Sequence, residues 1–499
     1  MTAARTDRTA GTFPDAELAY RAVSSRDPRF DGRVYVGVLS TGIYCRPSCP
    51  SRTPLPENCV FHASAAACVS AGFRACRRCR PDAQPGSRDW DLDADLAGRA
   101  LRLLEQGVAD DEGVAGLAAR LAVSPRHLHR VLIAQLGASP ADLARTRRAQ
   151  VARMLVEETD LPLSHVAFAA GFRSVRQFND VMRAHVGAPP SSLRAPRLPS
   201  VPAGPPAGAR LDGSSLELRL RHRAPFDAGA WLAHVSARAV PGLEEVHGTV
   251  VRRVLPGRLG PVLAELDLTD GVVARLVLPS LDGLTSAVGR LRHWADLDAD
   301  PARVDEVLGD DPFLAPLVAA RPGLRVVGTV DAAELALRTV LGQQVSVAGA
   351  RTLTARLVDA LGEISPWGLR AFPTPAAVAA AGEDGLFALG LTRARAAALA
   401  GLAAALDGGL DLAPGADRER SRAALAALPG IGPWTVDYIA LRALGDPDAF
   451  PAHDLVLRKV LGGVSPAEAR GRAERWRPWR GYAAQHLWTS LIDRRGDSR

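Results

Sequence analysis

The sequence has no long apolar run, no apolar segment at its start and, after Cys79, no cysteine. No stretch approaches the ~20 apolar residues that cross a bilayer. The first residues, MTAARTDRTAGTFPDAE, lack the hydrophobic core of a secretory signal, so we expect a cytoplasmic protein with no membrane partner. Because disulfides are rare in that compartment, clustered cysteines are expected to bind a metal or to react.

Lysine is scarce as well, because arginine supplies almost all of the 61 positive side chains. The net charge of +7 favours a polyanionic partner. A GC-rich genome that favours arginine and alanine would give the same bias, so charge alone leaves the partner open. The length of 499 residues exceeds one ordinary core, and about two to four domains are expected.

The cysteines have the spacing of a metal site. Cys45 and Cys49 form C-x3-C, and Cys76 and Cys79 form C-x2-C further along the chain. Two such pairs suit one tetrahedral zinc ion, with Zn–S distances of ~2.3 Å. Spacing alone favours a purely structural zinc over a reactive one. The remaining pair, Cys59 and Cys68, lacks such spacing and is expected to pack in the core.

The residues around these cysteines, TGIYCRPSC and GFRACRRCRP within residues 15–83, resemble the N-terminal domain of the Ada DNA-repair regulators. In that family four cysteines hold zinc, and the first accepts a methyl group from a methylated DNA phosphate. The resemblance implies that role for Cys45. A zinc-bound thiolate is deprotonated yet nucleophilic, as such a transfer needs. The cations expected to hold the DNA backbone are Arg46, Arg52, Arg74, Arg77, Arg78 and Arg80.

An internal repeat follows, since residues 117–143 match residues 166–193 with one inserted residue. Each copy predicts a helix, a short turn and a second helix that begins at an N-cap, Ser124 or Ser174. The pair resembles the AraC-type DNA-binding domain, whose second helices enter successive major grooves. For each exposed side chain the alternative to base reading is a phosphate contact. The candidates are Arg126, His127, His129, Arg130, Arg173, Arg176, Gln177 and Asn179.

A second motif, LPGIGPWT at residues 428–435, predicts two helices joined by a tight turn. Such a turn presents backbone N–H groups at a helix N-terminus, where a phosphate can bind. Gly430 and Gly432 would allow a DNA backbone to approach closely. A plain helical hairpin with no ligand is the alternative. About twenty residues further on, AFPAHDLVLRKVLG contains Asp454.

Hairpin, following helix and aspartate together resemble the helix-hairpin-helix DNA glycosylases, above all the AlkA type, which removes alkylated purines. The resemblance covers residues 216–493 and includes LRTVLGQQVSVAGARTLTARLV and AERWRPWRGYAAQHLW. It implies that Asp454 is the catalytic carboxylate, which stabilises an oxocarbenium-like state of the sugar as the base, flipped from the duplex, departs. It also implies a base pocket and a wedge that fills the gap in the duplex. The pocket residues would be Trp434, Tyr438 and Trp488, and the wedge Gln344.

The sequence departs from this family at several points. Gln344 stands where a bulkier apolar wedge is usual, and Leu455 stands where some relatives have an aromatic residue. Trp434 occupies the hairpin position of the lysine found in relatives that also cut the strand, which predicts a monofunctional glycosylase. The lack of late cysteines predicts no iron–sulfur cluster. For the aromatic residues core packing is the alternative, and Asp437 is a competing carboxylate.

These observations predict a multidomain, mainly α protein. A small α/β zinc domain (1–86), two helix-turn-helix units (90–195) and a proline-rich linker (196–210) would precede a mixed α/β domain (211–298) and an all-α helix-hairpin-helix glycosylase domain (300–499).

The predicted function is a fused response to DNA alkylation: methyl sensor, transcription regulator and alkyl-base glycosylase. Because no cysteine follows Cys79, the second methyltransferase domain usual in Ada proteins is not expected. Expected partners are alkylated and promoter double-stranded DNA, with RNA polymerase a further candidate. The alternative is a regulator whose glycosylase half serves only as a DNA-binding platform.

Overall fold

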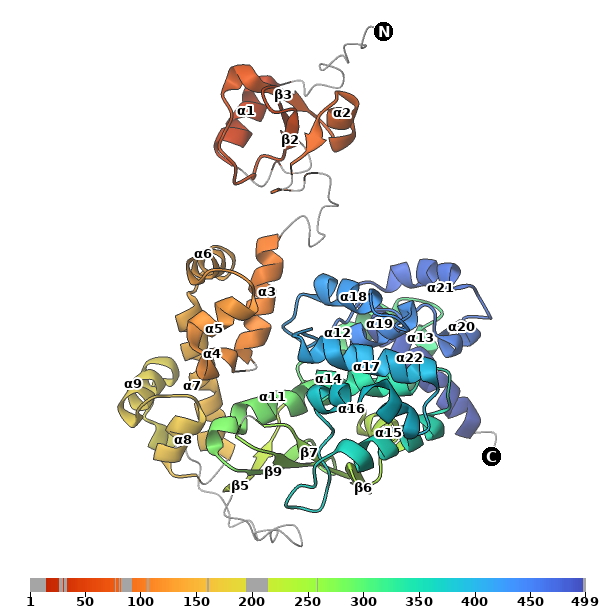
Figure 1. Cartoon of the computed structure of the whole chain (residues 1–499). Helices are drawn as coiled ribbons and strands as arrows, with labels where there is room; N and C mark the ends of the chain where they lie inside the picture. The colour runs from red at the N-terminus through yellow and green to blue at the C-terminus, as the bar shows by residue number, and fades with distance from the viewer. Residues whose placement is uncertain are drawn as a thin grey trace. The chain divides into compact units, whose positions relative to one another are not determined.

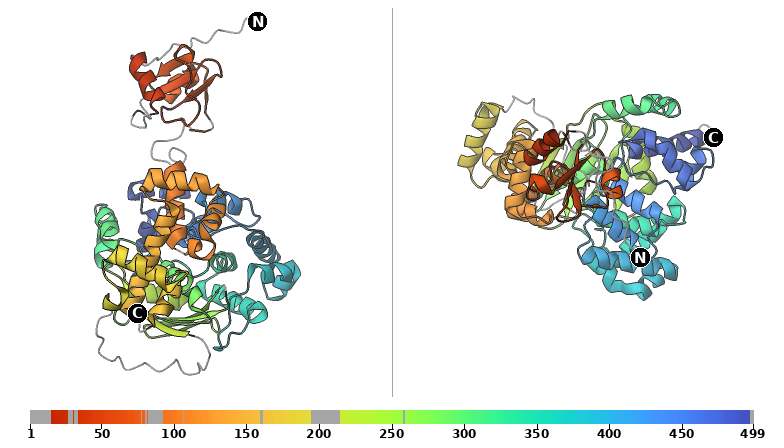
Figure 2. Two further views of the ribbon diagram at one scale, coloured as in Figure 1. Left: turned by 90° about the vertical axis from the view of Figure 1, so that its left-hand side faces the viewer. Right: turned by 90° about the horizontal axis from the view of Figure 1, so that it is seen from above.

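The computed structural model describes residues 15–26, 30, 34–76, 78–79, 81, 92–105, 107–158, 161–193, 214–257 and 259–496. The chain divides into two compact units (Figures 1 and 2). The first comprises residues 1–98 with 134–136, and the second comprises residues 99–133 with 137–499. The predicted linker at 196–210 lies outside the described residues. Within the described part, no helix is both long and apolar enough to cross a membrane.

The first unit contains a four-stranded sheet of order β3-β1-β2-β4. β1 pairs antiparallel with β2 and β3, whereas β4 runs parallel to β2. Alternate side chains face opposite sides: Val36 and Phe61 share a core with α1 and the paired cysteines, while Tyr35 and Tyr44 pack with Cys68 of α2. The bounds are α1 Ala16–Ser24, β1 Tyr35–Val38, β2 Ile43–Cys45, β3 Cys59–His62, α2 Ala65–Ser70 and β4 Arg74–Ala75.

The repeat forms two helix-turn-helix pairs, α5–α6 and α8–α9, joined by the long helix α7. The predicted N-caps are confirmed: Ser124 accepts a hydrogen bond from the His127 N–H at 3.2 Å, and Ser174 accepts one from the Gln177 N–H at 3.1 Å. The bounds are α3 Leu92–Glu105, α4 Val108–Asp111, α5 Gly113–Arg120, α6 Pro125–Leu136, α7 Pro140–Glu158, α8 Leu163–Ala169 and α9 Val175–Val186.

A five-stranded antiparallel sheet of order β5-β9-β8-β7-β6 follows. Figure 1 shows α11 lying along this sheet. This segment lies in the predicted mixed α/β domain, and the apolar side chains of its strands pack under α10 and α11. The bounds are β5 Ser214–Arg219, α10 Ala228–Arg238, β6 Glu244–His247, β7 Val250–Leu255, β8 Val262–Asp267, β9 Val273–Leu278 and α11 Leu284–Trp294.

The rest of the second unit is helical around one apolar core, as predicted. The hairpin is α18 and α19. The helices are α12 Pro301–Gly309, α13 Ala315–Ala320, α14 Ala332–Leu341, α15 Val347–Leu361, α16 Pro375–Ala388, α17 Arg393–Asp407, α18 Arg418–Ala426, α19 Pro433–Arg442, α20 Leu455–Val460, α21 Pro466–Ala473 and α22 Arg480–Gly496.

Within the second unit, the helix-turn-helix repeat packs on the C-terminal half. One continuous hydrophobic core includes Phe178 of α9, Leu218 of β5 and Trp231 of α10. At another contact, Leu103 of α3 lies so close to Gly415 that a Cβ on this glycine would sit 2.2 Å from the leucine side chain. These two parts of the chain therefore form one body.

Candidate functional site

The four paired cysteines lie together at one end of the first sheet. β2 and β4 are parallel, so Cys45, the last residue of β2, and Cys76, just after β4, leave the same end of adjacent strands. Cys49 lies in the turn after β2, where its N–H donates to the Arg46 carbonyl at 3.1 Å. With Cys79, the four Sγ atoms lie within 4.8 Å of one another, and all four residues are buried.

This donor set fits one zinc ion, as predicted. The thiols of Cys49 and Cys79, together with burial, raise the pKa of Cys45 far above its ordinary value. Four thiolates this close therefore require a cation among them, and zinc is the usual partner of four cysteines. Cys59 and Cys68 lie outside the cluster. Burial raises their pKa to about 11 and about 12 respectively, and Cys68 is fully buried, as expected for a packing residue.

Four of the six arginines predicted to hold the DNA backbone lie within the described residues. Arg52, Arg74 and Arg78 are exposed and Arg46 is half-buried. Arg77 and Arg80 lie outside the described residues.

The helix-turn-helix candidates lie near the N-termini of the second helices. Arg126, Arg130, Arg176 and Gln177 are exposed, whereas His127 is half-buried. Two of the side chains are already oriented by neighbours. Arg130 donates to Nδ1 of His127 at 2.9 Å, and the Gln177 side-chain oxygen accepts the Arg173 N–H at 3.2 Å. His129 lies on α6 and Asn179 on α9, whereas Arg173 lies in the turn before α9. His129 and Arg173 are exposed and Asn179 is half-buried.

The two hairpin glycines differ in their backbone. Gly430 has a φ of +79°, and a Cβ there would lie 2.6 Å from the Ala398 Cβ. The absence of a side chain at Gly430 therefore lets the hairpin turn pack closely against α17. Gly432 has a φ of −89°, with nothing within 4 Å of an added Cβ. It is the N-cap of α19 and makes no side-chain cap bond, so the first turn of α19 presents its N–H groups outward.

Asp454 is held by four hydrogen-bond donors. It is the N-cap of α20, and its Oδ1 accepts the N–H groups of Val456 and Leu457, each at 2.9 Å. Trp488 Nε1 also donates to Oδ1, at 3.2 Å, and Trp434 Nε1 donates to Oδ2 at 2.7 Å. Both carboxylate oxygens are thus fixed in direction, while the residue remains half-buried.

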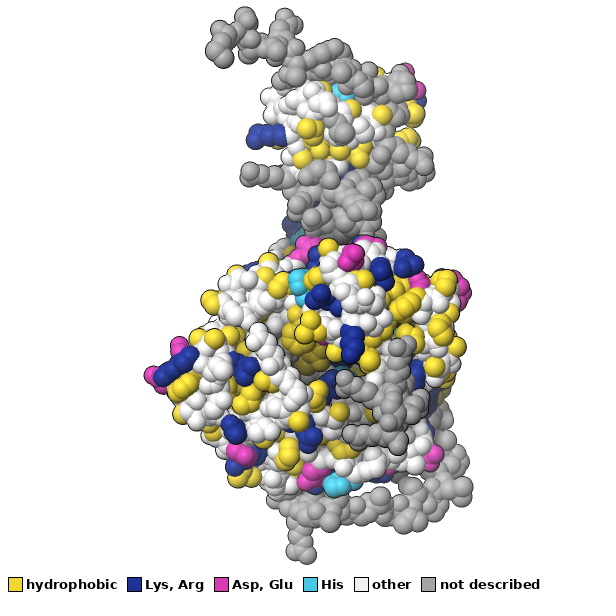
Figure 3. Space-filling view, turned by 90° about the vertical axis from the view of Figure 1, so that its right-hand side faces the viewer, with side chains coloured by type: hydrophobic (Ala, Val, Ile, Leu, Met, Phe, Trp, Pro, Cys, Tyr) yellow, Lys and Arg dark blue, Asp and Glu magenta, His cyan; other side chains and the backbone are white. Residues whose placement is uncertain are grey.

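The three predicted pocket aromatics form one cluster beside this carboxylate. Tyr438 stacks on Trp434 with ring centroids 5.2 Å apart and an interplanar angle of 24°. Trp488 meets Tyr438 edge to face at 6.1 Å. All three rings are half-buried, so part of their surface stays open. Figure 3 shows hydrophobic side chains around a hollow, with Lys and Arg near it, on the face where α20–α22 lie.

The competing carboxylate, Asp437, is placed differently. It is buried in α19 and forms an ion pair with Arg422 of α18, so it holds the two hairpin helices together. The indole N–H groups of Trp434 and Trp488 donate to Asp454 instead.

The predicted wedge lies in the loop between α14 and α15. Gln344 is exposed and has a φ of +55°, a left-handed conformation that is rare for glutamine. Strain of this kind persists only where neighbours impose it. Gln343 provides that restraint, because its Nε2 donates to the Gly430 carbonyl and to the Thr435 hydroxyl, both at 3.0 Å.

Four family models match consecutive parts of the chain. They describe the metal binding domain of Ada (residues 19–82), a helix-turn-helix domain (117–196), the AlkA N-terminal domain (217–331) and an HhH-GPD superfamily base excision DNA repair protein (337–477). The "Probable bifunctional transcriptional activator/DNA repair enzyme AlkA" of Mycobacterium tuberculosis is 47% identical over 487 residues, covering 96% of this chain and 97% of that protein.

The chain belongs to this bifunctional AlkA family. The C-terminal half of this chain is also 38% identical to Escherichia coli "DNA-3-methyladenine glycosylase 2", over 54% of this chain and 95% of that protein. A 3-methyladenine DNA-glycosylase from Archaeoglobus fulgidus has the same fold in this half, with a TM-score of 0.50 at 22% identity, over 56% of this chain and 98% of that one. The predicted family, fold class and DNA-binding character are thereby confirmed.

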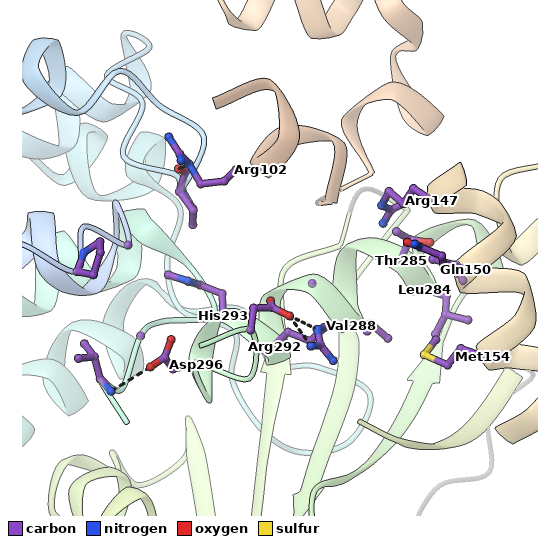
Figure 4. A pocket seen from close by; sticks show the side chains of 18 of the residues that line it. Arg102, Arg147, Gln150, Met154, Leu284, Thr285, Val288, Arg292, His293 and Asp296 are labelled. Carbon is purple, nitrogen blue, oxygen red and sulfur yellow. Dashed lines mark hydrogen bonds and ion pairs between the residues drawn. The ribbon is translucent and has the colours of Figure 1, made fainter. Parts of the chain in front are cut away.

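One cavity of this AlkA-family chain is not lined by Asp454. It measures about 540 Å³ between α3, α7, α11 and the loops beside α19 (Figure 4). Its charged side chains are partnered: Arg147 pairs with Asp110, Arg292 with Asp298, and Tyr482 donates to the Asp296 carboxylate at 2.7 Å. The aromatic rings beside Asp454 do not line this cavity.

Sequence reasoning missed three residues of the Asp454 site. Gln343 ties the wedge loop to the hairpin, and Arg395 donates to the Gln343 carbonyl at 2.6 Å. Arg442, on the last turn of α19, lies against two of the aromatic rings. The adjacent glutamines in LGQQVS gave a signal for Gln343. Nothing local in the sequence marks Arg395 or Arg442.

Proposed function

We propose that this chain is a DNA alkylation-damage response protein with two chemistries. In its first unit, Cys45 accepts a methyl group from a DNA methylphosphotriester and thereby switches transcriptional activation. In its C-terminal half, Asp454 drives hydrolysis of the N-glycosidic bond of alkylated purines such as 3-methyladenine. The observation that supports this best is the Asp454 carboxylate, fixed by two indole N–H groups and a helix N-terminus beside open aromatic rings.

The excision step needs a fixed negative charge and a surface for the flipped base. As the C1′–N bond lengthens, positive charge develops on the sugar, and the oriented Asp454 carboxylate stabilises it without reorganisation. Water then adds to C1′. The partly open faces of Trp434, Tyr438 and Trp488 offer stacking to the extruded base. Gly432 and the α19 N-terminus would hold a DNA phosphate, and Gln344 would fill the vacated stack.

We further propose that this glycosylase is monofunctional. Strand cutting by such enzymes requires an amine that attacks C1′. Lys459, the only lysine of the sequence, is exposed in the last turn of α20, and Trp434 occupies the hairpin position instead. The product is then an intact strand with an abasic site.

Methyl transfer would consume the protein. The Cys45 sulfur attacks the methyl carbon, an S–C bond forms, and the C–O bond breaks with its electrons left on the phosphodiester oxygen. A bound zinc ion would keep the four thiolates deprotonated at neutral pH. Cys49 accepts hydrogen bonds from Ser51, and Cys79 accepts one from the Arg46 backbone. Because a hydrogen bond to a thiolate lowers its nucleophilicity, these bonds weaken Cys49 and Cys79 as methyl acceptors.

The methylated protein would regulate transcription from the cytoplasm. Loss of one thiolate charge from a surface that faces DNA relieves repulsion of the phosphates, which tightens binding at a promoter. Arg126, His127, Arg130, Arg176 and Gln177 would read or hold that promoter DNA. RNA polymerase is the partner through which activation would follow.

Both chemistries can be tested on one preparation. After incubation with methylated DNA, we expect mass spectrometry to find a methyl group on Cys45. We also expect chromatography to find free 3-methyladenine, and the strand to stay uncut until alkali is added. A methyl group on no cysteine would leave zinc with a structural role only. No released base would support the alternative, in which the C-terminal half is a DNA-binding platform.

A further inference from the structure

A buried arginine lies against the aromatic cluster at Asp454. The guanidinium carbon of Arg442 is 5.0 Å from the ring centroid of Tyr438 and 5.3 Å from that of Trp488. Arg442 itself is only 2% exposed. The electron-rich faces that would attract a cationic base are therefore already shared with a cation of the protein.

Within the described residues no carboxylate forms an ion pair with Arg442, and the charge of Asp454 acts on it only through space. Its guanidinium donates to the Val327 carbonyl at 2.6 Å and to the side-chain oxygen of Gln485 at 3.1 Å, both neutral acceptors. Arg238, at the end of α10, adds a second positive charge near Tyr438. Burial raises the pKa of Tyr438, but the positive charges of Arg442 and Arg238 outweigh burial, so the pKa is lowered overall. This lowering indicates a positive potential at the ring.

Two arginines of this half are neutralised by carboxylates. Arg253 pairs with Glu244 at 2.7 Å and with Glu334 at 2.6 Å, and Arg338 pairs with the same two carboxylates. Arg325, which is 1% exposed, is held like Arg442 by neutral acceptors, four backbone carbonyls. Burying a cation in this way costs free energy. Arg442 differs from Arg325 because it lies against two rings of the Asp454 cluster, which points to a use at that site.

We propose that Arg442 is a specificity-determining residue, which shifts excision at Asp454 towards uncharged damaged purines and away from cationic ones. This inference rests on the proposed glycosylase function. An N3- or N7-alkylated purine is a cation in DNA, and it leaves as a neutral molecule when the C1′–N9 bond breaks and the electron pair stays on the base. An uncharged purine leaves by the same cleavage as an anion, and it takes a proton from water afterwards.

A fixed positive charge acts oppositely on these two classes. It stabilises the anion that forms as an uncharged purine departs, and it repels a cationic purine on entry. Cationic bases are excised faster because their C1′–N9 bond is weaker. Arg442 therefore reduces the difference in excision rate between cationic and uncharged bases. The range of excised bases then extends to lesions that carry no charge, such as 1,N6-ethenoadenine and hypoxanthine.

The test is a ratio of excision rates. Single-turnover rates are measured on one duplex containing hypoxanthine and on a matched duplex containing 7-methylguanine, for the full chain and its variants. We expect Arg442→Met to lower the hypoxanthine-to-7-methylguanine rate ratio by about tenfold or more, and Arg442→Lys to keep it within about threefold of wild type. A packing defect would lower both rates and leave the ratio unchanged, and an unchanged ratio overturns the proposal.

A second variant keeps the test decisive if Arg442→Met does not fold. Arg238 is half-buried, and Arg238→Met should lower the same ratio by a smaller factor, about threefold. If that ratio is also unmoved, the proposal fails. A wild-type protein that releases neither base would instead refute the glycosylase function itself, so the two failures are distinguishable.

Discussion

Gly430 allows a sharp prediction about the hairpin. Its φ of +79° lies in the left-handed region, which costs a residue with a side chain about 1–2 kcal/mol. A Cβ would also sit 2.6 Å from the Ala398 Cβ, inside any allowed contact. Because the obstacle is the short, stiff side chain of a packed helix, relieving it should cost about 1–3 kcal/mol more. We expect Gly430→Ala to destabilise the C-terminal half by about 2–5 kcal/mol in total.

Gly432 provides the matched control two residues away. Its φ is −89° and an added Cβ meets nothing within 4 Å, so Gly432→Ala should cost less than about 1 kcal/mol. Urea unfolding followed by tryptophan fluorescence reports on this half, because seven of the eight tryptophans follow residue 210. The midpoint of Gly430→Ala should fall by about 1–2 M. Equal midpoints for the two variants would refute the account of the turn.

Three further predictions concern other parts of the molecule. Gln343→Ala should slow base excision about tenfold by releasing the wedge loop from the hairpin, whereas Gln344→Ala should mainly weaken binding to duplex DNA; single-turnover rates and titrations separate the two. Burial raises the pKa of Asp296 to about 7, so the folded state holds a proton that the unfolded chain has released above about pH 4. Stability should therefore fall as the pH rises from about 4 to about 7, and the fall should be smaller in Asp296→Asn, as read from urea midpoints. Cys76→Ser should reduce the bound zinc below one ion per chain by metal analysis, and a full ion would contradict the four-cysteine site.

The sequence was most informative where local chemistry sets the structure. The N-caps Ser124 and Ser174 fix the start of both second helices, because each hydroxyl satisfies an amide within three residues of it. The spacing of the cysteine pairs likewise predicted a metal site, because two short pairs at the ends of adjacent strands bring four thiols together.

What escaped prediction depends on contacts between distant segments. Arg442 and Val327 lie more than a hundred residues apart, and only tertiary packing brings the end of α19 to the segment between α13 and α14. The contact of Leu103 with Gly415 is of the same kind. The sequence predicted that Gly430 lets a DNA backbone approach, but the absence of a side chain there also lets α17 pack against the turn. Such features have no periodic or local signature in the sequence.

The central claim is that Asp454 drives base excision, and two isosteric variants test it directly. Single-turnover release of 3-methyladenine should fall by several hundredfold or more in Asp454→Asn, because the charge that stabilises the sugar cation is lost. Asp437→Asn, which breaks the ion pair with Arg422, should retain the rate within about tenfold at a temperature where the protein is folded. An Asp454→Asn protein as active as wild type, or a loss confined to Asp437→Asn, would contradict the account.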